Sequence, residues 1–314
     1  MKSIKNYIKI ILFLSSLFLI ISSLSYLFIP KNNLKEFGMI EVAANGILGE
    51  PDNTIDVVVI GDSLTYTAFS PMQMYSEHGF TSYICGTSAQ RLYDSYSFFT
   101  TSIKKQKPKV VVLETNALFR DYTFVNTIIS GLKKSFPYLN YHNRWKNLSI
   151  NDLTENVNYT YTDNKKGYKL IKESRASKPR DYMKYKKGMH PIPKKNITYV
   201  KKIKEKCDEL GIEFILVSSN TQKNMNYKKH NSIKKLSEEL NIPYLDMNLQ
   251  SEINIDWTTE TKDKGDHLNY LGAKKATRFL GDYLVKNYKL PSHFGDPKYV
   301  TWDNEVEKYN ILVS

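Results

Sequence analysis

The sequence contains only two cysteines, Cys85 and Cys207. Two are too few for a disulfide framework, and their spacing is not that of metal ligands. We expect two isolated thiols. The sequence also has no glycine-rich phosphate loop and no clustered His, Asp and Glu at metal-ligand spacing. It therefore predicts neither a metal nor another cofactor.

Arginine is also scarce, at six of the 45 basic residues, and the lysines recur along most of the chain. Nucleic-acid-binding proteins instead concentrate lysine and arginine on one face, interleaved with aromatic residues. The formal net charge of +13 therefore does not favour nucleic acid as a partner. A basic surface facing anionic lipid head groups or wall polymers fits an envelope protein, and a diffusely solvated exterior explains the same charge.

The longest apolar run lies near the N-terminus, from Tyr7 to Ile29, and contains only Lys9 and scattered serines as polar residues. This is enough to cross the hydrocarbon core, which takes about 20 residues. Lys2, Lys5 and Lys9 place the N-terminus in the cytoplasm by the positive-inside tendency, although lysines on the other flank dilute that bias. We expect a single-pass protein of the cell membrane with its catalytic domain outside the cytoplasm.

A cleaved signal peptide is the alternative for this segment, because Ser23-Leu24-Ser25 crudely resembles a small-x-small cleavage site. We favour an uncleaved anchor, since the apolar run is longer than a usual signal core and no lipobox cysteine follows. The predicted organisation is a cytoplasmic N-terminus and anchor at 1–30, a juxtamembrane linker at 31–54 and an extracytoplasmic domain at 55–314.

Within that domain, five short runs rich in β-branched and apolar residues alternate with helical stretches. This pattern is typical of one α/β domain with a doubly wound parallel sheet between two helical layers. The predicted strands are 55–60, 80–85, 110–113, 212–217 and 242–245, and the predicted helices are 71–78, 88–106, 199–210, 230–240 and 270–286. Residues 119–193 lack such runs and predict a long insertion capping the sheet.

Two polar motifs lie where an open parallel sheet binds ligands, beyond the carboxyl ends of its strands. Gly61-Asp62-Ser63-Leu64 follows the first strand, and Asp266-His267 precedes the final helix. A serine nucleophile needs a base, and the base needs a carboxylate to fix its tautomer. We therefore predict Ser63 as nucleophile and His267 as base, although either motif alone is also common in turns and helix caps.

Four blocks in chain order together resemble the SGNH/GDSL hydrolases: Gly61 to Leu64, Gly86, Asn116 and Asp266-His267. The resemblance covers roughly residues 55–287. It implies a flavodoxin-like three-layer fold. It also implies an oxyanion hole made by the backbone N–H groups of Ser63 and Gly86 and by the Asn116 amide, which would stabilise the negative charge of the transition state.

The last block departs from the family pattern, which places the aspartate three residues before the histidine. Position 264 is lysine, with Asp263 four residues before His267 and Asp266 one before. We predict Asp266 as the triad acid, because Asp-His-Leu-Asn followed by Gly-Ala is similar to one subgroup of the family. Asp263 is the alternative.

That subgroup consists of bacterial proteins that work beside membrane-bound O-acyltransferases, including the lipoteichoic acid D-alanylation and alginate acetylation proteins. The similarity lies in the single span, the insertion with His142-Asn143-Arg144-Trp145, and the Asp-His-Leu-Asn ending. It implies acyl transfer to an envelope polysaccharide or teichoic acid, with such an acyltransferase as partner. His142, Arg144 and Trp145 would line an acceptor groove, or Arg144 would form a structural ion pair and Trp145 a core anchor.

Two other functions fit the same residues. An esterase would use the same site with water as acceptor and remove O-acyl groups from envelope glycans. A non-catalytic glycan-binding or scaffold protein is favoured by the lysine at position 264.

Overall fold

The computed structural model describes residues 2–314, so the first residue of the predicted anchor segment lies outside it. The chain forms two compact units. The helical unit comprises Met1–Val42 and Tyr122–Tyr161, and the sheet unit comprises Ala43–Asp121 and Thr162–Ser314. The predicted insertion at 119–193 is therefore divided, because 122–161 joins the N-terminal segment while 162–193 belongs to the sheet unit.

The sheet unit contains five parallel strands in the order β2-β1-β3-β4-β5. They are β1 Val57–Gly61, β2 Ser82–Gly86, β3 Val110–Glu114, β4 Glu213–Ser218 and β5 Tyr244–Asp246. The valine, isoleucine and leucine side chains of the three central strands are buried on both faces, as the continuous apolar runs predict. The predicted α/β fold with a doubly wound parallel sheet is confirmed.

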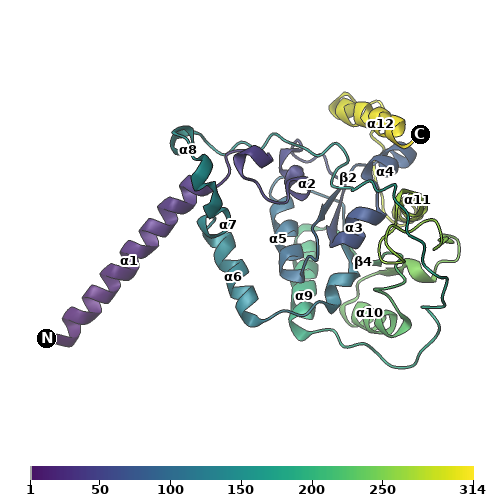
Figure 1. The fold of residues 1–314 in the computed structure, drawn as a ribbon, viewed down its shortest axis with the longest axis horizontal. Coiled ribbons are helices and arrows are strands. Elements are labelled where there is room, and N and C mark those ends of the chain that lie inside the picture. The colour runs from purple at the N-terminus through teal and green to yellow at the C-terminus, as the bar shows by residue number, and fades with distance from the viewer. Residues whose placement is uncertain (1) are drawn as a thin grey trace. The chain divides into compact units, whose positions relative to one another are not determined.

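Helices cover both faces of this sheet (Figure 1). One layer contains α3 Ser63–Ala68, α4 Pro71–His78 and α11 Tyr270–Asn287, and the other contains α5 Leu92–Ser102 and α9 Lys194–Leu210. Helix α10 Tyr227–Leu240 packs beside β5. The sequence predicted each of these helices except the short α3, with α5 shorter than expected.

A C-terminal helix, α12 Val300–Val313, was not predicted. It follows Pro297, packs on α4, and buries Trp302 and Tyr309. Its partly or fully buried positions 302, 306, 309 and 313 recur at helical spacing, a signal that the sequence analysis overlooked. The shorter elements of the sheet unit are η2 Gly46–Gly49, η3 Thr115–Phe119, η5 Met247–Leu249 and η6 Pro297–Tyr299, and α2 Val42–Asn45 lies at the boundary between the two units.

The described part of the helical unit has no strand. Its elements are α1 Lys2–Phe28, η1 Lys35–Phe37, α6 Phe124–Ser135, α7 Tyr138–Tyr141, η4 His142–Asn147 and α8 Asn151–Thr154. By length and composition, Ile4–Phe28 of α1 is a candidate membrane span. This segment overlaps the apolar run from Tyr7 to Ile29 that the sequence showed.

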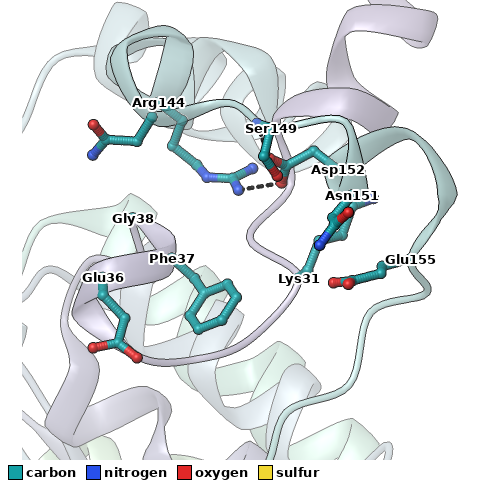
Figure 2. A pocket seen from close by; sticks show the side chains of 10 residues that line it. Lys31, Glu36, Phe37, Gly38, Arg144, Ser149, Asn151, Asp152 and Glu155 are labelled. Carbon is teal, nitrogen blue, oxygen red and sulfur yellow. Dashed lines mark hydrogen bonds and ion pairs between the residues drawn. The ribbon is translucent and has the colours of Figure 1, made fainter.

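The C-terminal end of α1 is bonded to the rest of the helical unit through Arg144. Its guanidinium donates to the Phe28 and Ile29 carbonyl oxygens at 2.8 and 2.9 Å and to Asp152 Oδ1 at 2.6 Å. Figure 2 shows this buried ion pair beside a cavity of about 330 Å³. Because the carbonyls that end a helix have no intrahelical partner, Arg144 caps α1. Its structural ion-pair role is confirmed.

Two ring contacts join α1 to the segment around α7. Phe28 packs edge-on against Tyr138, and Phe18 against Phe136. By contrast, Trp145 is 64% exposed, so its interpretation as a core anchor is wrong.

Candidate active site

Ser63 follows directly from the central strand β1. Gly61 ends that strand, and a Cβ at this position would lie 2.1 Å from Thr65 Oγ1 and 2.7 Å from Glu114 Cβ. Asp62 then caps α3, because its Oδ1 accepts a hydrogen bond from the Leu64 N–H. The absence of a side chain at Gly61 thus allows a tight strand-to-helix turn, with Ser63 as the first residue of α3.

Ser63 and His267 lie within hydrogen-bonding distance although 204 positions separate them in the chain. The distance from Ser63 Oγ to His267 Nε2 is 2.8 Å. His267 lies just before α11, which packs against α3. The packing of these two helices thus brings together the serine and histidine that the sequence singled out.

Asp263 is the carboxylate that holds the other side of the imidazole. Its Oδ2 lies 2.7 Å from His267 Nδ1, and its Oδ1 accepts a hydrogen bond from the His267 backbone N–H at 2.8 Å. The loop between them turns through Lys264 and Gly265, both with left-handed φ angles of 63° and 84°. This turn folds the chain back so that an acid four residues earlier reaches the ring.

Asp266, the acid preferred from the sequence, is directed elsewhere. Its Oδ1 accepts a hydrogen bond from Asn224 Nδ2 and lies 3.7 Å from His267 Nδ1. The geometry therefore favours Asp263 over Asp266 as the triad acid. The three-residue spacing of the family could not decide between Asp263 and Asp266, because the turn before His267 contains one additional residue in this chain.

The charge of Asp263 fixes the direction of the hydrogen bonds. Partial burial alone would raise the pKa of Asp263, but hydrogen bonds from the His267 backbone and ring outweigh it and lower the pKa below its ordinary value of 3.8. An ionised carboxylate only accepts hydrogen bonds, so the proton lies on His267 Nδ1 and leaves Nε2 free to accept from the Ser63 hydroxyl.

Both other predicted oxyanion-hole residues lie at the same edge of the sheet. Gly86 ends β2 in register with Gly61, and Asn116 follows β3. The Asn116 side chain donates one amide hydrogen to Asp62 Oδ2 at 2.7 Å. Asp62 therefore orients the Asn116 amide, which has a second amide hydrogen besides the one in this bond.

Arg120 and Glu114 are part of this arrangement, and the sequence analysis gave neither a role. Arg120 donates to Asp62 Oδ2 from both Nε, at 3.1 Å, and Nη2, at 2.5 Å. Arg120 directly follows the short helix η3 in an extended conformation, and the sequence offered no signal of its contact with Asp62. Glu114 is buried and accepts hydrogen bonds from the Asn116 N–H and the Ser219 hydroxyl.

Burial, together with the nearby Asp62 carboxylate, raises the pKa of Glu114 to about 8 from its ordinary 4.5. Lys229 lies near the same two acids and near Arg120. Its ammonium donates to the Asn224 carbonyl at 2.7 Å and lies 4.7 Å from the centre of the Phe119 ring. Burial lowers the pKa of Lys229. Asp62 and Glu114 therefore lie beside two basic side chains, those of Arg120 and Lys229.

Asp263, Asp266 and His267 form a cluster in which one donor atom from each lies within 4.8 Å of the others. Such a set resembles a metal site, which the sequence did not suggest. However, His267 Nδ1 and Asp263 are bonded to each other, and His267 Nε2 is bonded to Ser63. Both contacts therefore fit the order carboxylate, histidine, serine rather than a metal site.

The cavity of Figure 2 contains none of these residues, since its lining comes wholly from the helical unit. His142 and Trp145 do not line it, and Arg144 is engaged by Asp152. The predicted acceptor groove of His142, Arg144 and Trp145 is therefore not supported by this cavity.

No family model matches the chain, and no curated protein does. Among solved structures, the chain is similar to a GDSL-like lipase from Bacteroides thetaiotaomicron, with 12% identity over 73% of this chain and 87% of that one and a TM-score of 0.37. It is similar to a psychrotrophic esterase from Pseudoalteromonas, with 12% identity over 74% and 95% and a TM-score of 0.38. A lipase/acylhydrolase from Enterococcus faecalis matches with 12% identity over 76% and 99% and a TM-score of 0.39. The structures it resembles are thus SGNH/GDSL-like lipases, esterases and acylhydrolases.

Proposed function

We propose that this protein is a serine-dependent enzyme that transfers acyl groups through an ester on Ser63. The observation that carries this proposal is the 2.8 Å contact between Ser63 Oγ and His267 Nε2, with Asp263 on the opposite ring nitrogen. A nucleophile, a base and an orienting carboxylate in this order are the requirements of acyl transfer.

In the first step His267 Nε2 takes the Ser63 proton as Oγ bonds to the acyl carbonyl carbon. Asn116, with the Ser63 and Gly86 backbone N–H groups, would stabilise the resulting oxyanion. His267 then gives its proton to the departing oxygen. In the second step it takes a proton from the acceptor hydroxyl, which attacks the acyl-serine, and returns it to Ser63 as the ester breaks.

The acceptor we propose is a hydroxyl of a cell-envelope polysaccharide or teichoic acid, with the acyl group supplied through a membrane-bound O-acyltransferase. The resemblance to the D-alanylation and alginate acetylation proteins supports this choice. So does an anchor that remains part of the protein. Phe18, which precedes the possible cleavage site Ser23-Leu24-Ser25, packs edge-on against Phe136, as expected for a retained helix rather than a cleaved signal. We propose that the N-terminus is cytoplasmic and the sheet unit extracytoplasmic.

An esterase that removes acyl groups from the same polymers is the second candidate. It is favoured by the partial exposure of the site, since the His267 and Asp263 side chains are 17% and 30% exposed and water reaches them. The non-catalytic alternative rested on the lysine at position 264, where the family has its triad aspartate. Asp263 now removes that support, because its carboxylate contacts His267 Nδ1 as a triad acid would.

The O-acyl content of wall polymers distinguishes these candidates by the sign of the change. Cells carrying Ser63→Ala should lose polymer acylation if the protein is a transferase and gain it if the protein is an esterase. Ser97→Ala is the matched control, because Ser97 lies half-buried on α5, away from the triad. Unchanged acylation in Ser63→Ala cells would contradict both forms of the proposal.

A further inference from the structure

Helix α6 exposes its apolar residues and partly buries its polar ones, the reverse of an amphipathic helix on the surface of a soluble protein. Its apolar residues Val125, Ile128, Ile129 and Leu132 are exposed, whereas the polar Asn126, Thr127 and Ser130 are half-buried. The four apolar positions have the i, i+3, i+4, i+7 spacing of one helix face. An amphipathic helix normally directs that face into the protein core. In the part of the chain that the structure describes, this apolar face of α6 is exposed.

The rest of the helical unit also exposes many large apolar side chains. Outside α1 it is less than a quarter as long as the sheet unit, yet among the described side chains it carries as many large exposed apolar residues. Ile150 and Leu153 are two examples, at 78% and 60% exposure. Exposed apolar surface gathered in one region marks an interaction surface.

The contact between Phe18 and Phe136 points to the occupant of this surface. Phe136 directly follows α6, and Phe18 lies ten residues before the end of α1, which is about 15 Å along the helix axis. The backbone N–H of Tyr138 lies 3.4 Å from Ser25 Oγ, about one turn before that end. The C-terminal end of α6 thus adjoins a part of α1 inside the candidate span Ile4–Phe28.

Figure 1 shows α6 running away from α1 rather than alongside it. A helix that contacts a span within its length and then diverges from it can lie along the bilayer with its apolar face toward the acyl chains, as interfacial helices do. Exposed Tyr26 and Trp145 are of the residue types enriched at membrane interfaces.

We propose that α6 binds the lipid bilayer that α1 crosses, lying at its surface with Val125, Ile128, Ile129 and Leu132 among the acyl chains. Two helices then hold the protein at the membrane: α1 crosses the bilayer, and α6 lies along the bilayer surface. A second protein covering the same face is the competing occupant.

Depth-dependent quenching tests this proposal on the full-length protein in phosphatidylglycerol–phosphatidylethanolamine vesicles. Single cysteines at Ile128→Cys and Leu132→Cys carry the NBD fluorophore, and the vesicles contain doxyl-labelled phosphatidylcholine. Ile311→Cys is the matched control, because Ile311 is equally apolar and 76% exposed on α12 of the sheet unit. The unsubstituted chain measures any labelling of the buried Cys85 and Cys207.

We expect blue-shifted emission and loss of most of the fluorescence at positions 128 and 132, with water-like, unquenched emission at 311. Water-like emission at 128 and 132 would overturn the proposal. Blue-shifted emission that lipid does not quench would also overturn it, because a protein would then cover the face. An Ile11→Cys probe reports on α1, and the absence of quenching there would contradict the proposal as well.

Discussion

The Asp263 carboxylate lies 2.7 Å from His267 Nδ1 and also accepts a hydrogen bond from the His267 backbone N–H. One residue thus holds both the ring and the backbone of the proposed base. Asp266, the immediate neighbour of His267, instead bonds Asn224.

Asp263→Asn should lower kcat for 4-nitrophenyl acetate hydrolysis by about 10³–10⁴-fold, because the neutral amide no longer fixes the tautomer that accepts the Ser63 proton. Asp266→Asn is the matched control and should lower kcat by less than about tenfold. Rates measured on the purified full-length protein check this pair. A larger loss in Asp266→Asn than in Asp263→Asn would assign the triad acid to Asp266.

Asn116→Ala should lower kcat by about 10²–10³-fold with little change in KM, since an oxyanion-hole donor acts mainly in the transition state. Asn287→Ala is the control, because Asn287 lies at the end of α11 and its side chain donates a hydrogen bond to the Tyr283 carbonyl oxygen. Steady-state kinetics separate the two parameters. A rise in KM at constant kcat would show that Asn116 binds substrate without stabilising the oxyanion.

Glu114→Gln should change the dependence of stability on pH. The folded pKa of Glu114 is raised to about 8 from 4.5, so the folded state retains a proton that the unfolded chain releases. Its contribution to stability is therefore fully present below pH 4.5 and is lost as the pH rises to about 8. The variant has no such proton to lose.

Urea unfolding of the wild type and of Glu114→Gln at about pH 5 and about pH 8 measures this effect. The wild type should lose more free energy of unfolding than the variant between the two values. An equal pH dependence in both proteins would mean that Glu114 is ionised throughout the range.

Lys166→Met should destabilise the sheet unit by about 3–5 kcal/mol, because it leaves the buried Glu50 without its cation. Lys166 is almost fully buried, bonds Glu50 at 2.9 Å and Glu305 at 2.5 Å, and lies 4.8 Å from the centre of the Trp302 ring. The exposed Lys308→Met on α12 is the control and should change stability by less than about 0.5 kcal/mol. Equal effects of the two substitutions on the urea midpoint would contradict a structural role for the buried ammonium.

The strands and the Ser63–His267 pair could be predicted from the sequence because each has a local signal. A β-branched run that ends in Gly61 indicates a buried strand, and parallel strands place their following residues at one edge. The same rule brought Gly86 and Asn116 to that edge. Here the local pattern and the tertiary structure agree.

The features that could not be predicted depend on tertiary contacts. The choice of Asp263 depends on two successive left-handed residues, Lys264 and Gly265, and only glycine signals such a backbone. The role of Arg144 depends on the carbonyls at the end of α1, more than a hundred residues earlier in the chain. The exposure of the apolar face of α6 is likewise invisible to a periodicity analysis, which assigns such a face to the core.

The proposed mechanism depends on Ser63 acting as a nucleophile that His267 activates. Labelling of the full-length protein with a fluorophosphonate probe near neutral pH, followed by mass spectrometry of the modified peptide, tests it most directly. We expect one adduct on Ser63, which disappears in Ser63→Ala, falls sharply in His267→Ala and persists in Ser97→Ala. An unlabelled Ser63 in a folded protein, or labelling that does not depend on His267, would contradict it.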